Sequence, residues 1–243
     1  MTRRRADVLL VARGLARSRA QAQAAIEAGG VTAAGRPVTK ASELIAEDSA
    51  LDFAPAHQWV SRGGVKLEAA LDLFGVDCAG KIALDVGAAT GGFTHVLLTR
   101  GAALVFAVDV GRDQFDAALA ADPRVVVLEG QDARTLTRAE IPTPPQIVVC
   151  DASFIGAEKV LARPLELAAD EADLIVLIKP QFESGPRRKE RLDENEARRL
   201  AEETAGRLDG LSGFRAGKIA ESPLLGGAGA REFLLHARRS ARP

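Results

Sequence analysis

The sequence predicts a small α+β domain followed by a larger α/β domain whose strands form a mostly parallel sheet. Three observations lead to this prediction. From residue 81 onward, short apolar runs alternate with helical segments, which is the pattern of strands joined by crossover helices. The first apolar run, 82–86, breaks into a glycine-rich turn. The first 40 residues stand apart, because they carry eight lysines and arginines but only two acidic residues.

Composition limits the classes of protein that fit. Of the 243 residues, 47% are hydrophobic, so a sizeable core is available and global disorder is excluded. The formal net charge is −1, so the basic N-terminal segment is a local feature. It suggests an anionic partner such as nucleic acid, and the alternative is an ordinary solvated basic face.

The sequence gives no sign of a membrane or metal-binding protein. No apolar span is long enough for a membrane helix, and no signal-peptide core follows the arginine-rich start, so we expect a cytoplasmic protein. The two cysteines, Cys78 and Cys150, have neither metal-ligand spacing nor the pattern of a disulfide framework. We therefore expect no metal and no membrane partner.

The N-terminal segment predicts two helices and a small sheet. Apolar residues recur with helical periodicity over 6–29, interrupted by a glycine, which indicates two short helices. Ser18 is placed to cap the second helix, with Gln21 at the capping-box position. The segment 31–38 contains a Gly-Arg-Pro turn and predicts a hairpin, and 51–53 predicts a further strand.

The remainder of the chain predicts seven strands. We expect them at 82–86, 104–108, 125–128, 147–150, 174–178, 216–220 and 232–236, with helical segments between all but the last two. That last pair predicts a final antiparallel strand. The charged run 187–191 is expected to be solvated, or else to meet phosphates. These patterns place the small domain at 1–55, a linker at 56–62 and the larger domain at 63–243.

The turn after the first strand is the most informative motif. It reads Asp-x-Gly-x-x-x-Gly-Gly and leads into a helix, where free N–H groups favour an anion. It resembles the S-adenosylmethionine loop of Rossmann-type methyltransferases; a tight turn in another α/β protein is the alternative. The candidate cofactor-binding residues here are Asp85, Gly87, Ala88, Thr90, Gly91, Gly92 and Phe93.

Acidic residues also follow the second and third strands. Asp109 is placed to accept hydrogen bonds from a ribose diol. Asp132 could accept a hydrogen bond from an adenine amino group. Three acidic residues after three successive strands indicate a cofactor that contains a nucleoside.

The next two strands end in ionisable residues of opposite charge. Asp151 follows one apolar run and Lys179 follows the next, so both lie at the ligand-binding edge of the sheet. Charged residues there need a partner or a chemical role. An ion pair that only holds two loops together is the alternative to catalysis.

The N-terminal segment resembles the S4 RNA-binding domain over about residues 4–53. The resemblance rests on the two helices and on the turn at 29–38, Gly-Gly-Val-Thr-x-x-Gly-Arg-Pro-Val. It implies a basic helical surface that contacts RNA mainly through phosphates and shape. The positions that carry over are Arg5, Arg13, Arg17, Ser18, Arg19 and Gln21.

Five further motifs follow in order. They are Ser-Arg-Gly-Gly-x-Lys-Leu at 61–67, the glycine-rich turn at 84–94, Cys-Asp-Ala-Ser-Phe-Ile at 150–155, Lys-Pro-Gln-Phe-Glu at 179–183 and Arg-Glu-Phe at 231–233. With the S4-like segment before them, they resemble the TlyA family of ribosomal RNA 2′-O-ribose methyltransferases, often labelled haemolysin-like. The catalytic half resembles FtsJ/RrmJ-type enzymes, and the match covers roughly residues 4–238.

The resemblance implies methylation of a cytidine ribose in ribosomal RNA. S-adenosylmethionine would be the cofactor, and ribosomal RNA or ribosomal subunits would be the partner. The family's Lys-Asp-Lys-Glu tetrad falls on Lys66, Asp151, Lys179 and Glu232, and Asp151 is also expected beside the cofactor. Arg62, in the first of the five motifs, is expected to contact RNA.

The tetrad suits this chemistry. A ribose 2′-hydroxyl is a weak acid and must lose its proton as it attacks the methyl group. A lysine can take that proton only when burial or a neighbouring cation lowers its pKa, and Lys66 would be such a cation beside Lys179. Asp151 and Glu232 would orient the amines and balance their charge, so Lys179 is expected to act as base or to orient the hydroxyl.

Two other classes of function compete with this prediction. An S4-type RNA-binding or ribosome-assembly factor with a vestigial cofactor fold would not need the four ionisable residues. A membrane-lytic haemolysin would need a strongly amphipathic or membrane-spanning helix, and the sequence offers none.

Overall fold

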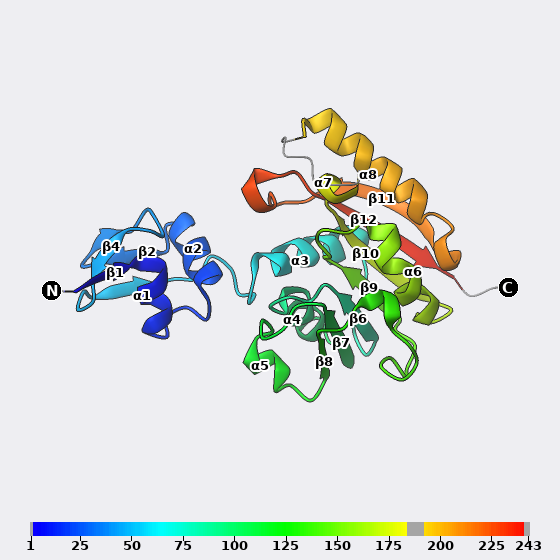
Figure 1. Ribbon diagram of the computed structural model, residues 1–243, viewed down its shortest axis with the longest axis horizontal. Coiled ribbons are helices and arrows are strands. Elements are labelled where there is room, and N and C mark those ends of the chain that lie inside the picture. The colour runs from blue at the N-terminus through cyan, green and yellow to red at the C-terminus, as the bar shows by residue number, and fades with distance from the viewer. Residues whose placement is uncertain (1, 184–191, 241–243) are drawn as a thin grey trace. The chain divides into compact units, whose positions relative to one another are not determined.

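The computed structural model describes residues 2–183 and 192–240. The chain divides into two compact units, Met1–Arg62 and Gly63–Pro243, and each is considered by itself (Figure 1). The predicted linker at 56–62 falls within the first unit under this division, so its separate status stays a prediction. The charged run 187–191 lies outside the described residues.

The small unit contains two helices and two small sheets. Its elements are β1 (Arg3–Arg5), α1 (Ala6–Ala12), α2 (Arg19–Glu27), β2 (Val31–Ala33), β3 (Arg36–Pro37), β4 (Leu44–Ala46) and β5 (Leu51–Phe53). The predicted helices, hairpin and β5 are all present, and β2 lies between β3 and β5. Leu9, Leu10 and Ile26 from the helices pack against Val31 and Ile45 from the strands to form the core.

The sequence analysis missed β1 and β4, which pair antiparallel with Arg4 opposite Ile45. Three consecutive arginines have no alternation of apolar and polar residues, so nothing in β1 indicates a strand. The predicted cap of α2 is confirmed, because Ser18 Oγ accepts a hydrogen bond from Gln21 N–H at 3.2 Å. The Gln21 side chain accepts from Arg17 N–H at 2.7 Å, one residue before the capping position.

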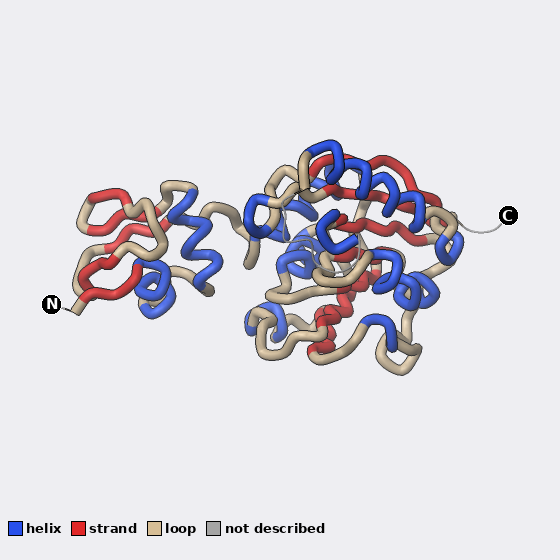
Figure 2. The backbone as a smooth tube through the Cα atoms, turned by 45° about the horizontal axis from the view of Figure 1, so that its top comes forward, coloured by secondary structure: helices blue, strands red, loops and turns tan. Residues whose placement is uncertain are grey.

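The large unit is built on a seven-stranded sheet (Figure 2). Its strands are β6 (Ile82–Val86), β7 (Leu104–Asp109), β8 (Val125–Glu129), β9 (Ile147–Cys150), β10 (Ala172–Ile178), β11 (Arg215–Glu221) and β12 (Phe233–Arg239). They lie in the order β11-β12-β10-β9-β6-β7-β8. β12 runs antiparallel to both of its neighbours, while the pairs among β6 to β10 are parallel. All seven predicted strands and the antiparallel last strand are confirmed.

Helices connect most of these strands. They are α3 (Arg62–Phe74), α4 (Gly92–Thr99), α5 (Ala117–Ala120), α6 (Ala157–Leu167), α7 (Pro180–Glu183) and α8 (Glu194–Leu208). Between β8 and β9 the predicted helical segment is a single 3₁₀ turn, Ala133–Thr135. Three prolines at 142, 144 and 145 follow it, and proline has no N–H to continue a helix.

Alternation along the strands decides which side chains face which helices. Val86, Ile178 and Phe233 belong to one core cluster with residues of α6 and α8, so they point to that face of the sheet. Their neighbours in the chain point to the opposite face. There Asp85 meets α4 and Glu232 meets α3. The ionisable residues at the strand ends thus share one face.

Two further findings concern membrane-spanning helices and cysteines. Within the described residues, no helix is long and apolar enough to cross a membrane. Both cysteines are buried and unbridged.

Candidate active site

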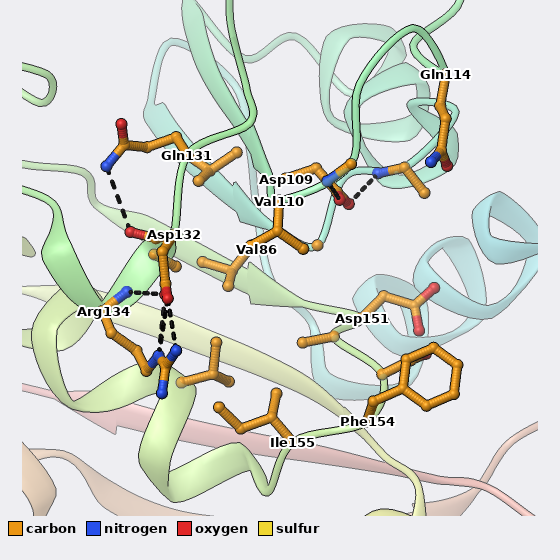
Figure 3. Close-up of a pocket in the computed structure, with 18 residues that line it drawn as sticks. Val86, Asp109, Val110, Gln114, Gln131, Asp132, Arg134, Asp151, Phe154 and Ile155 are labelled. Carbon is orange, nitrogen blue, oxygen red and sulfur yellow. Dashed lines mark hydrogen bonds and ion pairs between the residues drawn. The ribbon is translucent and has the colours of Figure 1, made fainter.

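A cavity of about 650 Å³ opens at the carboxyl ends of β6 to β9 (Figure 3). Of the residues predicted to bind the cofactor, Gly87, Asp109, Asp132 and Asp151 line it. Ala89, Val110, Gln114 and Arg134 also line it, and the sequence analysis did not select them. The cavity lies where parallel sheets hold their ligands, outside the ends of the strands.

The backbone geometry explains why the turn after β6 contains glycines. Gly87 has φ of +83°, and a Cβ there would lie 2.9 Å from the backbone nitrogen of Ala152. Gly91 has φ of +89°, and a Cβ there would lie 2.8 Å from Leu119 Cδ1. Both positions therefore require glycine. The turn brings β6 and the loop after β9 into close contact at the cavity.

The rest of the turn lies behind the cavity wall. Ala88, Gly91, Gly92 and Phe93 are buried, and Thr90 accepts a backbone hydrogen bond from Asp116 N–H at 3.3 Å. These five residues are not part of the cavity lining. Direct contact between them and a cofactor stays a prediction.

Asp85 also lies behind the wall. Its side chain is fully buried, and its Oδ2 accepts a hydrogen bond from the Thr94 hydroxyl at 2.7 Å. Burial raises the pKa of this carboxyl to about 7. The bond to Thr94 links β6 to the first turn of α4, so Asp85 holds the glycine turn rather than facing the cavity.

Asp109 connects the turn to the end of β7. Its Oδ2 accepts from Ala89 N–H at 2.8 Å and its Oδ1 accepts from Gly111 N–H at 2.7 Å. A carboxylate oxygen can accept more than one hydrogen bond, so both oxygens keep capacity for a ribose diol. The two backbone contacts fix the carboxylate at the cavity wall.

Asp132 has a partner that the sequence analysis missed. Arg134 Nη2 lies 2.6 Å from Asp132 Oδ2, and Arg134 Nε lies 3.0 Å from Oδ1 (Figure 3). These hydrogen bonds hold the pKa of Asp132 below its usual value. An adenine amino group would therefore meet a carboxylate that is already oriented by a guanidinium. The available signal was the Asp-x-Arg spacing, which forms the same pair at Asp122 and Arg124.

Strand register brings three residues of the predicted tetrad to one place. Ile178 of β10 lies opposite Phe233 of β12. Lys179 and Glu232 are the next residues beyond this pair, and opposite residues of an antiparallel pair share a face. Asp151 directly follows Cys150, which pairs with Val176 of β10. Residues that are 28 and 53 positions apart in the sequence thus lie together in one site.

Lys179 is held by three oxygen atoms. Its Nζ lies 2.7 Å from Asp151 Oδ1, 2.9 Å from the Asp151 carbonyl oxygen and 2.7 Å from Ser153 Oγ. The predicted ion pair between Asp151 and Lys179 is therefore present. Asp151 and Ser153 both line the cavity, so this amine lies directly behind the cavity wall.

Lys66 forms an ion pair with Glu232, and both side chains are almost fully buried. The loop after β11 closes over this pair, because a Cβ at Gly226 would overlap Glu232 Oε1. The structure therefore brings all four predicted residues to one edge of the sheet as two ion pairs. Among the described residues, no cluster of three histidine, cysteine or acidic side chains is arranged to hold a metal ion.

Two aromatic residues stand at the rim, and the sequence analysis did not assign either of them. Phe154 lies within the Cys-Asp-Ala-Ser-Phe-Ile motif, has φ of +70° and is 69% exposed. Its ring centroid lies 4.9 Å from that of Phe182. The neighbouring Glu183 is structural, since it accepts from Ala157 N–H at 3.0 Å and pairs with Arg207 at 3.0 Å.

The residues predicted to bind RNA differ in the contacts that they make. Arg5 and Arg19 share hydrogen bonds with the buried Asp7 and remain partly exposed. Arg13 instead donates to the carbonyl oxygens of Glu47 and Ser49, so it anchors the loop between β4 and β5. Arg17 and Arg62 are exposed, Ser18 and Gln21 are engaged in the cap of α2, and RNA contact by all seven stays a prediction.

Comparison with known proteins agrees with this geometry. Residues 59–239 match the model of the FtsJ-like methyltransferase family, and residues 4–49 match the S4 domain. The fold and the site thus define an S-adenosylmethionine-dependent methyltransferase with an S4 domain at its N-terminus.

Three relatives narrow this class. The chain is 48% identical to the 16S/23S rRNA (cytidine-2′-O)-methyltransferase TlyA of Mycobacterium tuberculosis, over 75% of this chain and 69% of that protein. It is 39% identical to YqxC of Bacillus subtilis, whose rRNA methyltransferase name is provisional, over 96% of this chain and 84% of that protein. The structure of a provisionally named hemolysin from Streptococcus thermophilus superposes with a TM-score of 0.76 at 34% identity, covering 100% of this chain and 90% of that one. The chain belongs to the TlyA family.

Proposed function

We propose that this protein transfers a methyl group from S-adenosylmethionine to the 2′-hydroxyl of a cytidine in ribosomal RNA. The observation that carries the proposal is the Lys179 amine, fixed by Asp151 and Ser153 immediately behind the cavity wall. The name of the M. tuberculosis relative, at 48% identity, supports the same substrate and the same atom. A ribosomal RNA substrate also agrees with the cytoplasmic location expected from the sequence.

The cavity residues suit the cofactor. S-adenosylmethionine supplies an electrophilic methyl group on a cationic sulfur. Asp109, anchored by two backbone N–H groups, would accept hydrogen bonds from its ribose diol. Asp132, oriented by Arg134, would accept from its adenine amino group. Asp109 ends β7 and Asp132 follows the neighbouring strand β8, so the two carboxylates lie at different points along the cavity wall.

Lys179 would hold the ribose hydroxyl that attacks. Its two contacts with Asp151 come from the backbone and the side chain of one residue, and they fix the position of Nζ. The third contact, Ser153 Oγ, belongs to an exposed residue that lines the cavity. A ribose 2′-hydroxyl can replace that serine hydroxyl at Nζ, which places the attacking oxygen beside an amine that donates a hydrogen bond to it as the ammonium or takes its proton as the uncharged amine.

Lys66 and Glu232 would support this amine from behind. Continuing the strand register places Glu232 beside Lys179, and Glu232 carries its own cation in Lys66. The two lysines and two carboxylates balance in charge. In its charged form the Lys179 amine would therefore lie beside the developing negative charge on the ribose oxygen, while Lys66 balances Glu232 behind it.

Methylation of defined substrates tests the proposal. Purified protein is incubated with labelled S-adenosylmethionine and intact ribosomes, separated subunits or free ribosomal RNA, and the modified nucleotide is mapped. We expect one cytidine, or very few, to gain a methyl group on the ribose. A methyl group on a base, or no transfer to any ribosomal substrate, would contradict the proposal.

The same preparation separates the two competing functions. A non-catalytic ribosome-assembly factor would bind ribosomal RNA without transferring methyl groups. A haemolysin, the label carried by the S. thermophilus relative, would lyse erythrocytes at concentrations at which methyl transfer is measured. Each outcome is read from the same protein sample.

A further inference from the structure

The basic N-terminal unit has a buried carboxylate at the centre of its predicted RNA-binding residues. Asp7 lies in the first turn of α1, and its side chain is fully buried. Its Oδ1 accepts from Val8 N–H at 3.0 Å, which ties the carboxylate to the start of the helix. A carboxylate repels a polyanion, so its presence in a domain that is expected to bind RNA requires a structural explanation.

That reason lies in the hydrogen bonds that Asp7 accepts. Arg5 Nε lies 3.0 Å from Oδ1, and Arg5 Nη2 lies 3.1 Å from Oδ2. Arg19 approaches Oδ2 with Nη2 at 2.7 Å and Nε at 3.1 Å. Gln23 Nε2 completes the set at 3.1 Å from Oδ2. These hydrogen bonds hold the pKa of Asp7 well below its usual value, so the carboxylate is ionised.

The two guanidiniums come from different parts of the unit. Arg5 ends β1, whereas Arg19 is the first residue of α2. Their side chains remain 43% and 57% exposed. A guanidinium has five N–H donors, and Asp7 uses two from each, so three on each arginine remain for another anion. One buried carboxylate thus fixes two cations that keep free donors.

We propose that Asp7 is a positioning residue that holds Arg5 and Arg19 as one prearranged site for an RNA phosphate. The inference rests on the proposed binding of RNA by the small unit. A free arginine side chain loses conformational entropy when it binds a phosphate, and a guanidinium that is already fixed loses less. Asp7 therefore increases RNA affinity although its charge opposes RNA.

This role gives a prediction of opposite sign to simple electrostatics. By charge alone, removing a carboxylate from a basic surface strengthens RNA binding and steepens its dependence on salt. If Asp7 positions the two arginines, Asp7→Asn weakens binding. A matched control is Glu47→Gln, because Glu47 pairs with Arg4 at 2.8 Å on the surface of the same unit. The control removes an equal charge without disturbing the Asp7 cluster.

The experiment measures binding of the full chain to a ribosomal RNA transcript over a salt series. We expect Asp7→Asn to weaken binding about tenfold and to reduce the salt slope by about one, while Glu47→Gln leaves affinity unchanged or raises it. Far-UV circular dichroism and denaturant unfolding of each variant report whether it is folded. Equal or tighter binding by folded Asp7→Asn overturns the inference.

A second set of variants does not depend on the folding of Asp7→Asn. If the two arginines act as one site, Arg5→Gln and Arg19→Gln each remove most of its contribution, and the double variant loses little more. Additive losses overturn the inference. If the double variant binds RNA as the unaltered protein does at every salt concentration, the predicted RNA surface itself is wrong. Tighter binding by Asp7→Asn together with weaker binding by both arginine variants overturns the positioning role alone.

Discussion

The edge of the sheet carries two lysine–carboxylate pairs that differ in how they meet the cavity. The lysine side chains are similarly buried, with 11% of Lys179 and 10% of Lys66 exposed. Their carboxylates differ, since 24% of the Asp151 side chain is exposed against 4% for Glu232. Asp151 lines the cavity, and Glu232 is covered by the loop that contains Gly226.

The two pairs are therefore expected to have different roles, although each consists of a lysine and a carboxylate. A buried pair must compensate for the loss of hydration of two charges, and removing one partner leaves the other buried and uncompensated. A pair that faces a cavity can exchange one of its contacts for a substrate atom. We therefore expect changes at Lys179 to appear mainly in the rate and changes at Lys66 or Glu232 mainly in stability.

The largest expected effect follows loss of the Lys179 amine behind the cavity wall. Lys179→Ala should lower the single-turnover rate of methyl transfer by about 10²–10⁴-fold, because it removes the group that holds or deprotonates the hydroxyl. Cofactor affinity, measured by calorimetry, should change little, since Asp109 and Asp132 lie on other strands. Ser153→Ala is the matched control and should retain most of the rate, because the ribose hydroxyl replaces that contact. A near-normal rate for Lys179→Ala would make the pair structural only.

The covered pair should respond in stability. Lys66→Ala leaves Glu232 buried without its cation, and breaking such a pair costs about 3–5 kcal/mol. Replacing both, in Lys66→Met with Glu232→Gln, should recover much of that loss while activity stays low. Denaturant unfolding of the three proteins measures both changes. Equal unfolding free energies for Lys66→Ala and the unaltered protein would show that water reaches the pair.

The covering loop provides a smaller and more local test. A Cβ at Gly226 would overlap Glu232 Oε1, whereas a Cβ at Gly227 would meet no atom within 4 Å. Gly226→Ala should therefore lower the unfolding free energy by about 1–3 kcal/mol, as overpacking does, and Gly227→Ala by less than about 0.5 kcal/mol. The same denaturant measurement compares these adjacent alanines. If both variants lose the same amount, the effect comes from loop flexibility and not from the seal over Glu232.

Local patterns in the sequence predicted the sheet and two of the four residues at its edge. Apolar runs marked every strand of the large unit, and residues that directly follow a strand must lie at its edge whatever the details of packing. Asp151 and Lys179 could be placed in this way from their positions alone. Lys66 and Glu232 were identified from the family resemblance. Neither the sequence of the helix that carries Lys66 nor that of the last strand, which follows Glu232, indicates that the two side chains form an ion pair.

Other features depend on long-range contacts or local conformations that no pattern in the sequence indicates. The pairing of β1 with β4 joins arginines to a strand 41 residues away, and neither segment is long enough to show alternation. Asp132 could be seen as a ligand but not as a partner of Arg134, because the rotamer decides whether the guanidinium turns back. The exposed Phe154 depends on a positive φ, which no sequence rule assigns to phenylalanine.

The third carboxylate near this edge, Asp85, sharpens the comparison because no lysine among the described residues pairs with it. Burial raises its pKa to about 7, against about 3.9 in an unfolded chain, so between these values the folded state holds more protons than the unfolded state. Its contribution to stability is therefore complete below about pH 4 and is lost as pH rises through about 7. Asp85→Asn should remove this dependence, while its amide oxygen still accepts the hydrogen bond from Thr94. The difference in unfolding free energy between the two proteins, measured from pH 4.5 to 8, should shift in favour of the variant as pH rises. Asp122→Asn is the control, since hydrogen bonds from Arg124 lower the pKa of Asp122 to about 2 and its contribution is constant over this range. A difference for Asp85→Asn that does not vary with pH would mean that this carboxyl is ionised in the folded protein throughout the range and is compensated despite its burial.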